Sequence, residues 1–317
     1  MERHGGPEVL EWAAVVDSAP GASDLVVDLA FAGLNFIDVY QRTGLYPMEL
    51  PFVPGSEGAG VVRAIGAEVS RFAVGDRVAW SSVLGSCAEH VRVPEAVAVA
   101  VPDAIGLDVA AAVMLQGMTA HYLALDTFPV TGGHRCLIHA GAGGTGLLLI
   151  QIAKRRGAEV FTTVGSAEKV DLTRDAGADH VIRYDEEDFG AAVERIAGDR
   201  PLDVVYDGVG QAVFSRSLEL LRRRGTMVTF GNASGAVEPM SPLVLTRNGS
   251  LYLTRPTLVD YVSTREDLER RSGDLFTWIA DGSLRVRIGA RVPLAEAAEA
   301  HRMIEGRATT GKTLLEA

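Results

Sequence analysis

A glycine-rich turn between two apolar segments constrains the fold of this chain more than any other feature. The run Arg135–Ile138 stops at a turn with glycines at 141, 143, 144 and 146, and a helix-length apolar segment follows to Lys154. At this spacing the first glycine permits the bend, the second lets backbone approach a pyrophosphate, and the third allows close helix–strand packing. The helix start also offers free N–H groups and a positive dipole end to phosphates. We therefore predict a dinucleotide-binding unit with contacts from Gly141, Gly143, Gly144, Thr145 and Gly146.

The residues after this turn alternate between strand and helix patterns. We expect strands at 159–164, 180–182, 202–206, 226–230 and 250–254, separated by helices such as 167–176 and 212–224. Such alternation predicts a parallel sheet with right-handed crossovers. Six strands in two halves would place a dinucleotide across the carboxyl ends of the strands. Residues 115–255 are therefore predicted to form a Rossmann domain.

The flanking segments have a different pattern. Before residue 110, short strand candidates such as 58–66 and 74–80 are punctuated by Gly, Pro and Asp, which favours a mostly antiparallel β domain. After residue 260 we expect a helix from Thr264 to about Ala280 with Gly282 near its end, a shorter helix at 294–305 and a strand at 313–315. Residues 256–317 are predicted to return to the domain formed by residues 1–114. The predicted fold class is α/β, with a doubly wound parallel sheet inserted in a mostly β domain.

Composition excludes several classes of protein. The net charge of −11 argues against nucleic acid as the main partner, because phosphate contacts favour a basic surface. No apolar run approaches the roughly 18 residues of a membrane span, and no apolar segment typical of a secretory leader follows the first residues. With only Cys87 and Cys136, a disulfide framework is not expected. We therefore expect a cytoplasmic protein without a membrane segment.

Two basic clusters precede glycines, Lys154–Arg156 before Gly157 and Arg222–Arg224 before Gly225. We expect both at the C-terminal ends of helices, where cations complement the helix dipole. Neither cluster therefore needs a ligand to explain it.

The second strand of the predicted Rossmann domain bears on the choice of cofactor. A site that prefers NAD usually carries Asp or Glu at the end of this strand, to bind the ribose 2′-hydroxyl. Here the strand runs into Val164-Gly165-Ser166-Ala167-Glu168-Lys169, with no carboxylate at its tip. A 2′-phosphate could bind there to backbone N–H groups, the Ser166 hydroxyl and the Lys169 ammonium. We therefore predict NADP, held by Gly165, Ser166 and Lys169, although Lys169 alone would also fit an ordinary exposed helix lysine.

Residue spacing gives no sign of a metal site. The seven histidines show no HxxxH or HExxH pattern, and the two cysteines form no CxxC pair. A zinc site needs three or four N, S or O ligands, usually in recognisable clusters. His139, beside the glycine turn, is expected to pack or to form hydrogen bonds. The segment 55–60 lacks the spacing of a nucleophile elbow, so hydride chemistry without a metal is predicted.

Several ordered segments resemble the quinone oxidoreductase, or zeta-crystallin-like, branch of the medium-chain dehydrogenases/reductases. They are Gly33–Tyr40, Gly44–Pro47, Leu50–Gly60, Leu115–Tyr122, Val204–Asp207, Phe230–Gly235 and Ser250–Thr257. The resemblance covers nearly the whole chain. It implies a GroES-like catalytic domain, a Rossmann domain that binds NADPH, a quinone or another electron-poor small molecule as substrate, and a homodimer paired through the Rossmann domains.

The same resemblance implies where the site residues lie. Zinc-dependent relatives carry Cys where Asn35 stands and His where Ser56 stands, which implies that the metal has been lost. In the zinc-free branch Asn35, Asp38, Tyr40 and Tyr46 line the nicotinamide and substrate cleft, and Asn35, Tyr40 and Tyr46 are our catalytic candidates. The implied cofactor contacts are Asp38, Thr119, Tyr184, Phe230, Gly231, Asn232, Thr254, Arg255 and Lys312.

The implied chemistry is transfer of reducing equivalents from NADPH to a quinone, as a hydride or as two successive electrons. Asn35 would hold or shape the nicotinamide pocket, while Tyr40 and Tyr46 would offer flat faces and a hydroxyl to the quinone. Without the resemblance, ordinary packing would be the favoured interpretation of the two tyrosines. Two other functions stay open: NADPH-dependent reduction of an activated alkene such as an enal or enone, and a non-enzymatic, crystallin-like role with NADPH or AU-rich RNA as ligand. The acidic charge disfavours RNA.

Overall fold

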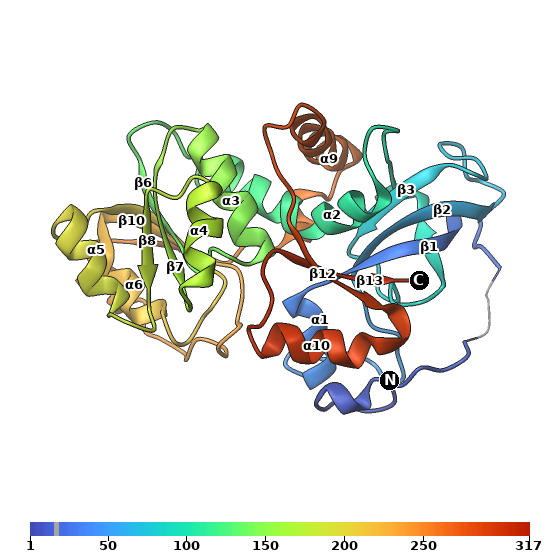
Figure 1. Cartoon of the computed structure of the whole chain (residues 1–317), viewed down its shortest axis with the longest axis horizontal. Helices are drawn as coiled ribbons and strands as arrows, with labels where there is room; N and C mark the ends of the chain where they lie inside the picture. The colour runs from blue at the N-terminus through green and yellow to red at the C-terminus, as the bar shows by residue number, and fades with distance from the viewer. Residues whose placement is uncertain (16–18) are drawn as a thin grey trace. The chain divides into compact units, whose positions relative to one another are not determined.

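The computed structural model describes residues 1–15 and 19–317, and the chain divides into two compact units. Unit 1 comprises Met1–Met118 and Tyr261–Ala317, and unit 2 comprises Thr119–Asp260 (Figure 1). Unit 2 is therefore an insertion in the sequence of unit 1. The boundaries expected from the sequence, after residues 114 and 255, lie inside helix α2 (Leu107–Tyr122) and just before α8 (Leu258–Tyr261).

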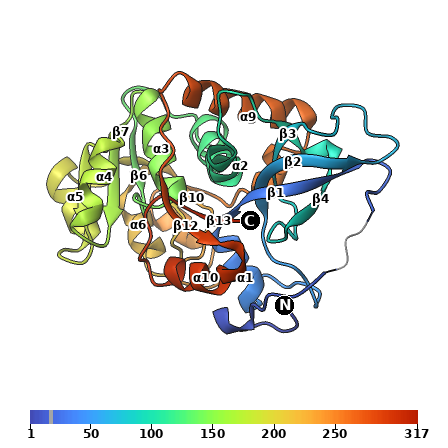
Figure 2. The ribbon, with the colours of Figure 1, turned by 45° about the vertical axis from the view of Figure 1, so that its right-hand side comes forward.

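Unit 1 is built on a seven-stranded, mostly antiparallel sheet. The strand order is β12-β13-β1-β2-β3-β5, and β4 also pairs with β1. Figure 2 shows β1 and β2 side by side in this sheet. The C-terminal strand returns to the first one, so that Leu34 lies opposite Thr313. The strands are β1 (Asp24–Leu34), β2 (Glu57–Ile65), β3 (Arg77–Ser81), β4 (His90–Pro94), β5 (Val99–Ala100), β12 (Ile288–Pro293) and β13 (Lys312–Glu316).

Alternation of side chains explains the core of unit 1. Leu25, Val27 and Leu29 of β1 face one way and are buried, as expected for a strand with one face on a core. Trp80 of β3 is fully buried in the same core, and its indole Nε1 donates to Ser86 Oγ at 2.9 Å. The helical elements of this unit are η1 (Pro7–Val9), α1 (Phe36–Thr43), η2 (Glu95–Val97), most of α2, α9 (Arg265–Ala280), η4 (Leu294–Glu296) and α10 (Ala297–Glu305).

Helix α9 begins and ends as the sequence predicts. Thr264 precedes it, and its Oγ1 accepts a hydrogen bond from the Asp267 N–H at 3.1 Å, which satisfies one of the N–H groups left open at a helix start. Gly282 follows the end of the helix with φ of 76°, a left-handed conformation that favours glycine.

Unit 2 is a six-stranded sheet in which every strand pair is parallel. Its order is β11-β10-β9-β6-β7-β8, which corresponds to strands 6-5-4-1-2-3 of the unit. This is the doubly wound order, and the predicted fold class is confirmed. Helices α3 and α4 cover one face, and α5 and α6 cover the other (Figure 1). The elements are η3 (Leu123–Thr127), β6 (Arg135–Ile138), α3 (Gly144–Arg155), β7 (Glu159–Val164), α4 (Glu168–Asp175), β8 (His180–Arg183), α5 (Phe189–Ala197), β9 (Leu202–Asp207), α6 (Phe214–Leu220), β10 (Leu221–Thr229), α7 (Leu243–Arg247) and β11 (Tyr252–Thr254).

One predicted helix is shorter in the structure, and this corrects our interpretation of a basic cluster. Helix α6 ends at Leu220, and β10 begins at Leu221, so Arg222–Arg224 lie within β10 and not at a helix end. The Arg222 guanidinium pairs with Asp203 instead. The helix that we expected to reach Arg224 ends earlier because Leu221 pairs with Leu202 in the sheet. The other cluster, Lys154–Arg156, does end helix α3 before Gly157.

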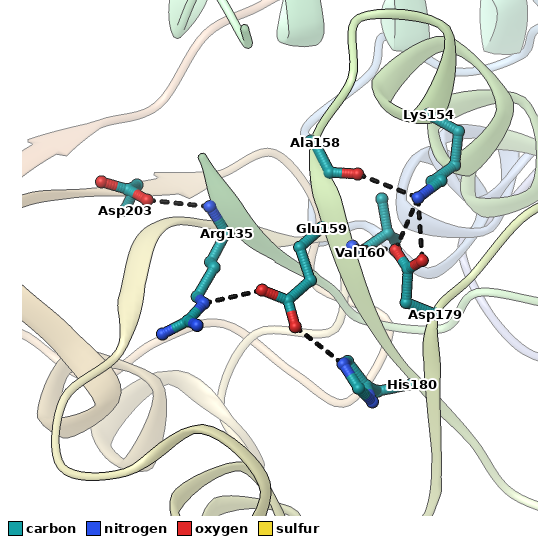
Figure 3. Close-up of polar contacts among 8 residues, drawn as sticks. All are labelled: Arg135, Lys154, Ala158, Glu159, Val160, Asp179, His180 and Asp203. Atoms are coloured by element: carbon teal, nitrogen blue, oxygen red, sulfur yellow. Dashed lines mark hydrogen bonds and ion pairs between the residues drawn. The ribbon is translucent and has the colours of Figure 1, made fainter. Parts of the chain in front are cut away.

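A network of charged side chains joins the amino ends of three unit 2 strands (Figure 3). Arg135 Nε donates to Glu159 at 2.7 Å, and His180 Nε2 lies 2.8 Å from the other oxygen of the same carboxylate. Lys154 from α3 donates to Asp179 at 2.8 Å. These side chains are 28–41 % exposed, so water screens them and each pair stabilises the fold only weakly. Because they lie at the amino ends, the carboxyl-end edge is left for other residues.

His139, just after β6, is enclosed in the interior of unit 2. Its Nδ1 lies 3.0 Å from Thr163 Oγ1 and its Nε2 2.9 Å from Ser217 Oγ, and its ring meets Phe189 edge-on at 5.0 Å. Burial lowers the pKa of His139 to about 3, so the ring is neutral near pH 7. A neutral ring has one donor and one acceptor nitrogen, and two hydroxyls can serve both. The side chain packs and forms hydrogen bonds, as the sequence predicts.

No helix in the described part of the chain is both long and apolar enough to cross a membrane.

We expect the free energy of unfolding to depend on pH in a way that shows the neutral state of buried His139. In the unfolded chain His139 titrates near its ordinary value of 6.5, so between pH 6.5 and about 3 the unfolded state binds the extra proton. His139 therefore costs the folded state up to about 1.4 kcal/mol per pH unit below 6.5. The His139→Gln variant keeps a donor and an acceptor but does not titrate. Its deficit in free energy of unfolding should be largest at pH 7 and shrink toward pH 5 in urea titrations, whereas a deficit independent of pH would contradict the assignment.

Candidate functional site

The parallel sheet of unit 2 gathers the predicted cofactor residues at one edge. Because all six strands run the same way, their carboxyl ends lie together, and the chain leaves the sheet there six times. Thr119 lies outside this set, buried in α2. The residues that follow or end these strands are Gly141, Gly143, Gly144, Thr145 and Gly146 after β6, Gly165 and Ser166 after β7, Tyr184 after β8, Phe230, Gly231 and Asn232 after β10, Thr254 at the end of β11 and Arg255 after it.

The glycine turn after β6 is fitted tightly against its neighbours. The Gly141 N–H donates to Thr163 O at 3.0 Å, which fixes the turn to β7. A Cβ at Gly146 would lie 2.5 Å from Ala140 O and 2.8 Å from Gly141 Cα, so only glycine lets α3 start this close to the turn. At Gly143, by contrast, the nearest atom to a Cβ would be Ala140 O at 3.3 Å. The space above Gly143 is therefore open to a ligand, as close approach to a pyrophosphate requires.

The chain after β7 forms a second part of this edge. The Tyr184 side chain lies over Gly165. A Cβ at Gly165 would therefore collide with the Tyr184 hydroxyl. Ser166 Oγ donates to Glu168 Oε1 at 3.4 Å, and the Lys169 N–H donates to Ser166 O at 3.2 Å. Helix α4 begins at Glu168, so Lys169 is its second residue. Gly165, Ser166, Lys169 and Tyr184 therefore lie together at one helix start, where N–H groups, a hydroxyl and an ammonium can bind a phosphate.

A third part of the edge joins the chain after β9 to the chain after β10. Asp207 Oδ1 accepts from the N–H groups of Val209 and Gly210, at 2.7 and 2.8 Å. Burial raises the pKa of Asp207 to about 6. The Phe230 ring covers Gly208, and Arg255 Nη1 donates to Gly231 O at 3.3 Å. These contacts hold Phe230, Gly231 and Arg255 in one compact loop cluster beside the end of β11.

The edge as a whole fits a dinucleotide. The open backbone at Gly143, the start of α3, the Ser166 hydroxyl and the Lys169 ammonium are groups of the kind that can bind a pyrophosphate and a second phosphate. Gly165 and Ser166, directly after β7, carry no carboxylate, which favours a phosphate there over a 2′-hydroxyl, although the Glu168 carboxylate lies beside Ser166 Oγ.

In unit 1 the candidate residues surround the junction of β1 and α1. Asn35 is the residue before α1, and its side chain is buried, with 4 % of the residue exposed. The amide donates to Gly33 O at 3.1 Å and to Glu57 Oε1 at 2.7 Å, and its Oδ1 accepts from Gln116 Nε2 at 3.0 Å and from Lys312 Nζ at 2.9 Å. Both amide hydrogens and both acceptor directions of Asn35 are thus used within unit 1.

Asp38 lies inside the first turn of α1, and it is fully buried. Its Oδ2 accepts from the Asn35 N–H at 2.8 Å, and its Oδ1 accepts from Ser56 Oγ at 2.8 Å. Burial raises the pKa of Asp38 to about 6, although the hydrogen bonds from Ser56 and Asn35 and the nearby Lys312 favour the charged form. Asp38, which the resemblance implies as a cofactor contact, here caps α1 and binds Ser56.

Glu57, like Gln116, was not among the site residues expected from the sequence. It begins β2 with no exposed surface, and its Oε1 accepts from both Asn35 and Lys312 while Oε2 accepts from the Leu115 N–H at 2.6 Å. Burial lowers the pKa of Lys312, and Glu57 opposes that shift. One signal was available: an acidic residue among Gly, Ala and Val at the start of a strand expected to be buried needs a partner.

The two tyrosines pack against each other at the end of α1. Gly44 ends the helix with φ of 82°, a left-handed turn that brings the Tyr46 N–H to Tyr40 O at 3.0 Å. The two rings lie 5.1 Å apart between centroids, and Tyr40 is buried while Tyr46 is half-buried. Tyr46 is therefore the member of the pair with surface to offer to a ligand.

The part of the chain that the structure describes contains no group of three or more His, Cys, Asp or Glu side chains that could hold a metal ion. The two positions at which zinc-dependent relatives carry ligands hold Asn35 and Ser56, whose polar groups are bound to protein partners.

Two family models match the chain. The model described as "Alcohol dehydrogenase GroES-like domain" matches residues 21–131, and the model described as "Zinc-binding dehydrogenase" matches residues 144–269.

Known proteins are similar over the full length. The quinone oxidoreductase of Pseudomonas aeruginosa is 45 % identical over 98 % of this chain and 97 % of its own. The crystal structure of Escherichia coli quinone oxidoreductase complexed with NADPH is 41 % identical, with a TM-score of 0.98 over 100 % of this chain and 98 % of that one. The 2-haloacrylate reductase of a Burkholderia species is 37 % identical over 99 % of this chain and 97 % of its own.

The glycine turn offers a matched pair of substitutions. Gly146→Ala should lower the free energy of unfolding by about 1–3 kcal/mol, because its Cβ meets backbone atoms that cannot move aside. Gly143→Ala should lose much less stability than Gly146→Ala, because φ of −74° suits alanine and its Cβ meets only one backbone atom, at 3.3 Å. It should instead weaken dinucleotide binding, since the methyl group occupies the open space above the turn. Urea unfolding and a fluorescence titration with NADPH measure the two effects, and a stable Gly143→Ala variant with parental affinity would show that the pyrophosphate binds elsewhere.

Proposed function

This chain belongs to the quinone oxidoreductase family, and we propose that it transfers reducing equivalents from NADPH to a quinone without a metal. One observation supports the proposal most: the carboxyl edge of the unit 2 sheet brings together an open glycine turn, Ser166 and Lys169, with no acidic residue directly after β7. The full-length similarity to quinone oxidoreductases, one of them in complex with NADPH, supports the choice of cofactor and acceptor.

The residues of unit 2 would bind the cofactor. The turn from Gly141 to Gly146 and the start of α3 bind the pyrophosphate through backbone N–H groups and the helix dipole. Ser166, Lys169 and Tyr184 hold the 2′-phosphate. NADPH supplies a hydride or two successive electrons when bound. The remaining contacts are assigned, as the family resemblance implies, to Thr119, Phe230, Gly231, Asn232, Thr254 and Arg255. The resemblance implies Asp38 and Lys312 as well, but both side chains are buried in unit 1 and bound to protein partners.

The residues of unit 1 would shape the acceptor site. Tyr46 offers a half-exposed ring and a hydroxyl to a quinone oxygen, and the buried Tyr40 supports it from behind. Asn35 fixes the start of the helix that carries Tyr40. A quinone is already electron-poor, so aligning it and excluding water are the main tasks of these residues.

A second acceptor class is favoured by one comparison. The 2-haloacrylate reductase relative bears a name that describes reduction of an activated alkene, and the same donor geometry serves an enal or enone. Kinetic assays with NADPH against a panel of benzoquinones, naphthoquinones, enals and haloacrylates separate the two. The quinone proposal requires a kcat/KM for quinones well above that for every alkene.

We also propose a homodimer and a cytoplasmic location. Strand β11 is an edge of the unit 2 sheet, and Tyr252 and Leu253 on it are 62 % and 38 % exposed, which is unusual for large apolar side chains on a strand. Pairing of two β11 edges would cover them.

The acidic charge argues against nucleic acid as a ligand, so a salt-dependent RNA titration should show no specific binding.

Cofactor preference can be tested at Lys169. A hydrogen bond to a charged group contributes about 1.5–3 kcal/mol, so Lys169→Ala should weaken NADPH binding roughly 10- to 100-fold and leave NADH almost unchanged. Lys154→Ala is the matched control, because Lys154 binds Asp179 at the amino ends of the strands. Equal losses for both cofactors in the Lys169 variant would place the 2′-phosphate elsewhere.

The acceptor site can be tested at Tyr46. Tyr46→Phe removes only the hydroxyl of a half-buried side chain and keeps the ring packed against Tyr40, so the variant should fold normally. Its kcat/KM for a quinone should fall by a modest factor, about 2- to 10-fold, because a quinone needs little acid catalysis to accept a hydride. A lower melting temperature with unchanged kinetics would show that the hydroxyl serves the fold.

A further inference from the structure

Two charged residues fix the orientation of the Asn35 amide. An amide can usually turn by 180° and exchange its donor and acceptor ends. Here the Nδ2 end faces Glu57, a carboxylate that only accepts, and the Oδ1 end faces Lys312, an ammonium that only donates. A turned amide would set a donor against a donor and an acceptor against an acceptor.

The orientation of the Asn35 amide also fixes the orientation of the Gln116 amide. Its Nε2 donates to Asn35 Oδ1 at 3.0 Å, which leaves its Oε1 pointing away from Asn35. That oxygen is buried and has no hydrogen-bond partner among the residues that the structure describes. The cluster therefore ends in one defined acceptor, whose identity depends on Glu57 and Lys312.

The pair that sets this orientation is enclosed in unit 1. Glu57 and Lys312 side chains are 0 % and 1 % exposed, and they pair directly with each other. They join four parts of the fold: β2, β13, helix α2 through the Leu115 N–H, and the β1–α1 junction through Asn35. A buried ion pair is weak evidence for a gain in stability, but it can specify one arrangement.

We propose that Glu57 and Lys312 are positioning residues of the acceptor site, which hold the Asn35 and Gln116 amides in one orientation. Lys312 then acts through Asn35 and not by contact with NADPH, the role that the family resemblance implies for it. Asn35 begins the helix that carries Tyr40, so its orientation also sets the start of that helix. The inference rests on the proposed function for its kinetic readout.

The test compares Lys312→Met, Glu57→Gln and the double variant Lys312→Met/Glu57→Gln. Each is measured for melting temperature, for NADPH dissociation constant by fluorescence without quinone, and for kcat with a quinone. Either single variant leaves a buried charge without its partner, so its melting temperature should fall by several degrees. The double variant carries neither charge, so it should be more stable than both singles.

Activity should not follow stability. The amide that Glu57→Gln introduces can donate as well as accept, so in the double variant the Asn35 amide loses its fixed orientation. We expect kcat to stay roughly 10- to 100-fold below the parent, as for a misplaced reacting group, while the NADPH dissociation constant stays within about 3-fold. Lys154→Met/Asp179→Asn is the matched control, since it neutralises a partly exposed Lys–Asp pair of unit 2 and should leave kcat unchanged.

Two outcomes would overturn the proposal. A double variant with parental kcat would show that the pair serves folding alone, and it decides the matter even if the single variants do not fold. A Lys312→Met variant with a large loss of NADPH affinity, not recovered in the double variant, would show that Lys312 binds the cofactor.

A parent protein that binds NADPH but reduces no quinone would contradict the proposed function and not the positioning role. The positioning role of Glu57 and Lys312 is then tested by NMR of the Asn35 side-chain amide. Its hydrogens should exchange slowly with water in the parent and quickly in Glu57→Gln, and equal exchange rates would refute the proposal.

Discussion

The pairing of the last strand with the first determines the candidate acceptor site. Leu34 lies opposite Thr313 in this pairing, and the antiparallel register places Lys312 beside Asn35, 277 residues away in sequence. β2 pairs with the other edge of β1 and brings Glu57 to the same point. A shift of β13 by one residue would turn Lys312 to the other face of the sheet, because side chains alternate along a strand. The buried charge of Glu57 would then lack its partner, so the register and the charge pair stabilise each other.

Unit 2 reaches a similar result by a different route. Its candidate residues at the carboxyl edge follow or end five of the six strands, and no long-range ion pair is needed to gather them, because parallel strands end at one edge. The charged pairs of Arg135, Glu159 and Lys154 lie at the opposite ends of the strands. The amino ends of the strands thus carry partly exposed ion pairs, whereas their carboxyl ends carry the open backbone at Gly143.

Much of this arrangement could be predicted from sequence, and the exceptions have physical reasons. The glycine turn, the strands predicted at 159–164 and 202–206 and helix α9 have local signals: apolar periodicity, a glycine spacing, and a Thr before the helix. Helix α6 was predicted to reach Arg224 because periodicity does not register that a neighbouring strand pairs with Leu221. Glu57 was missed for a related reason. Its partners Lys312 and Leu115 are 255 and 58 residues away, and only the folded sheet brings them together.

The structure also changes how Asn35 should be understood. From sequence, its amide was a candidate to hold the nicotinamide, but all of its hydrogen-bonding capacity is directed to Gly33, Glu57, Gln116 and Lys312. A direct hydrogen bond to a ligand would require one of these bonds to break, at a cost of about 1–3 kcal/mol for a buried group left unsatisfied. The simpler arrangement leaves Asn35 in place and lets it act through its neighbours. Its effect on chemistry would then come from the position of α1 and the Gln116 carbonyl, and both depend on the same buried carboxylate and ammonium.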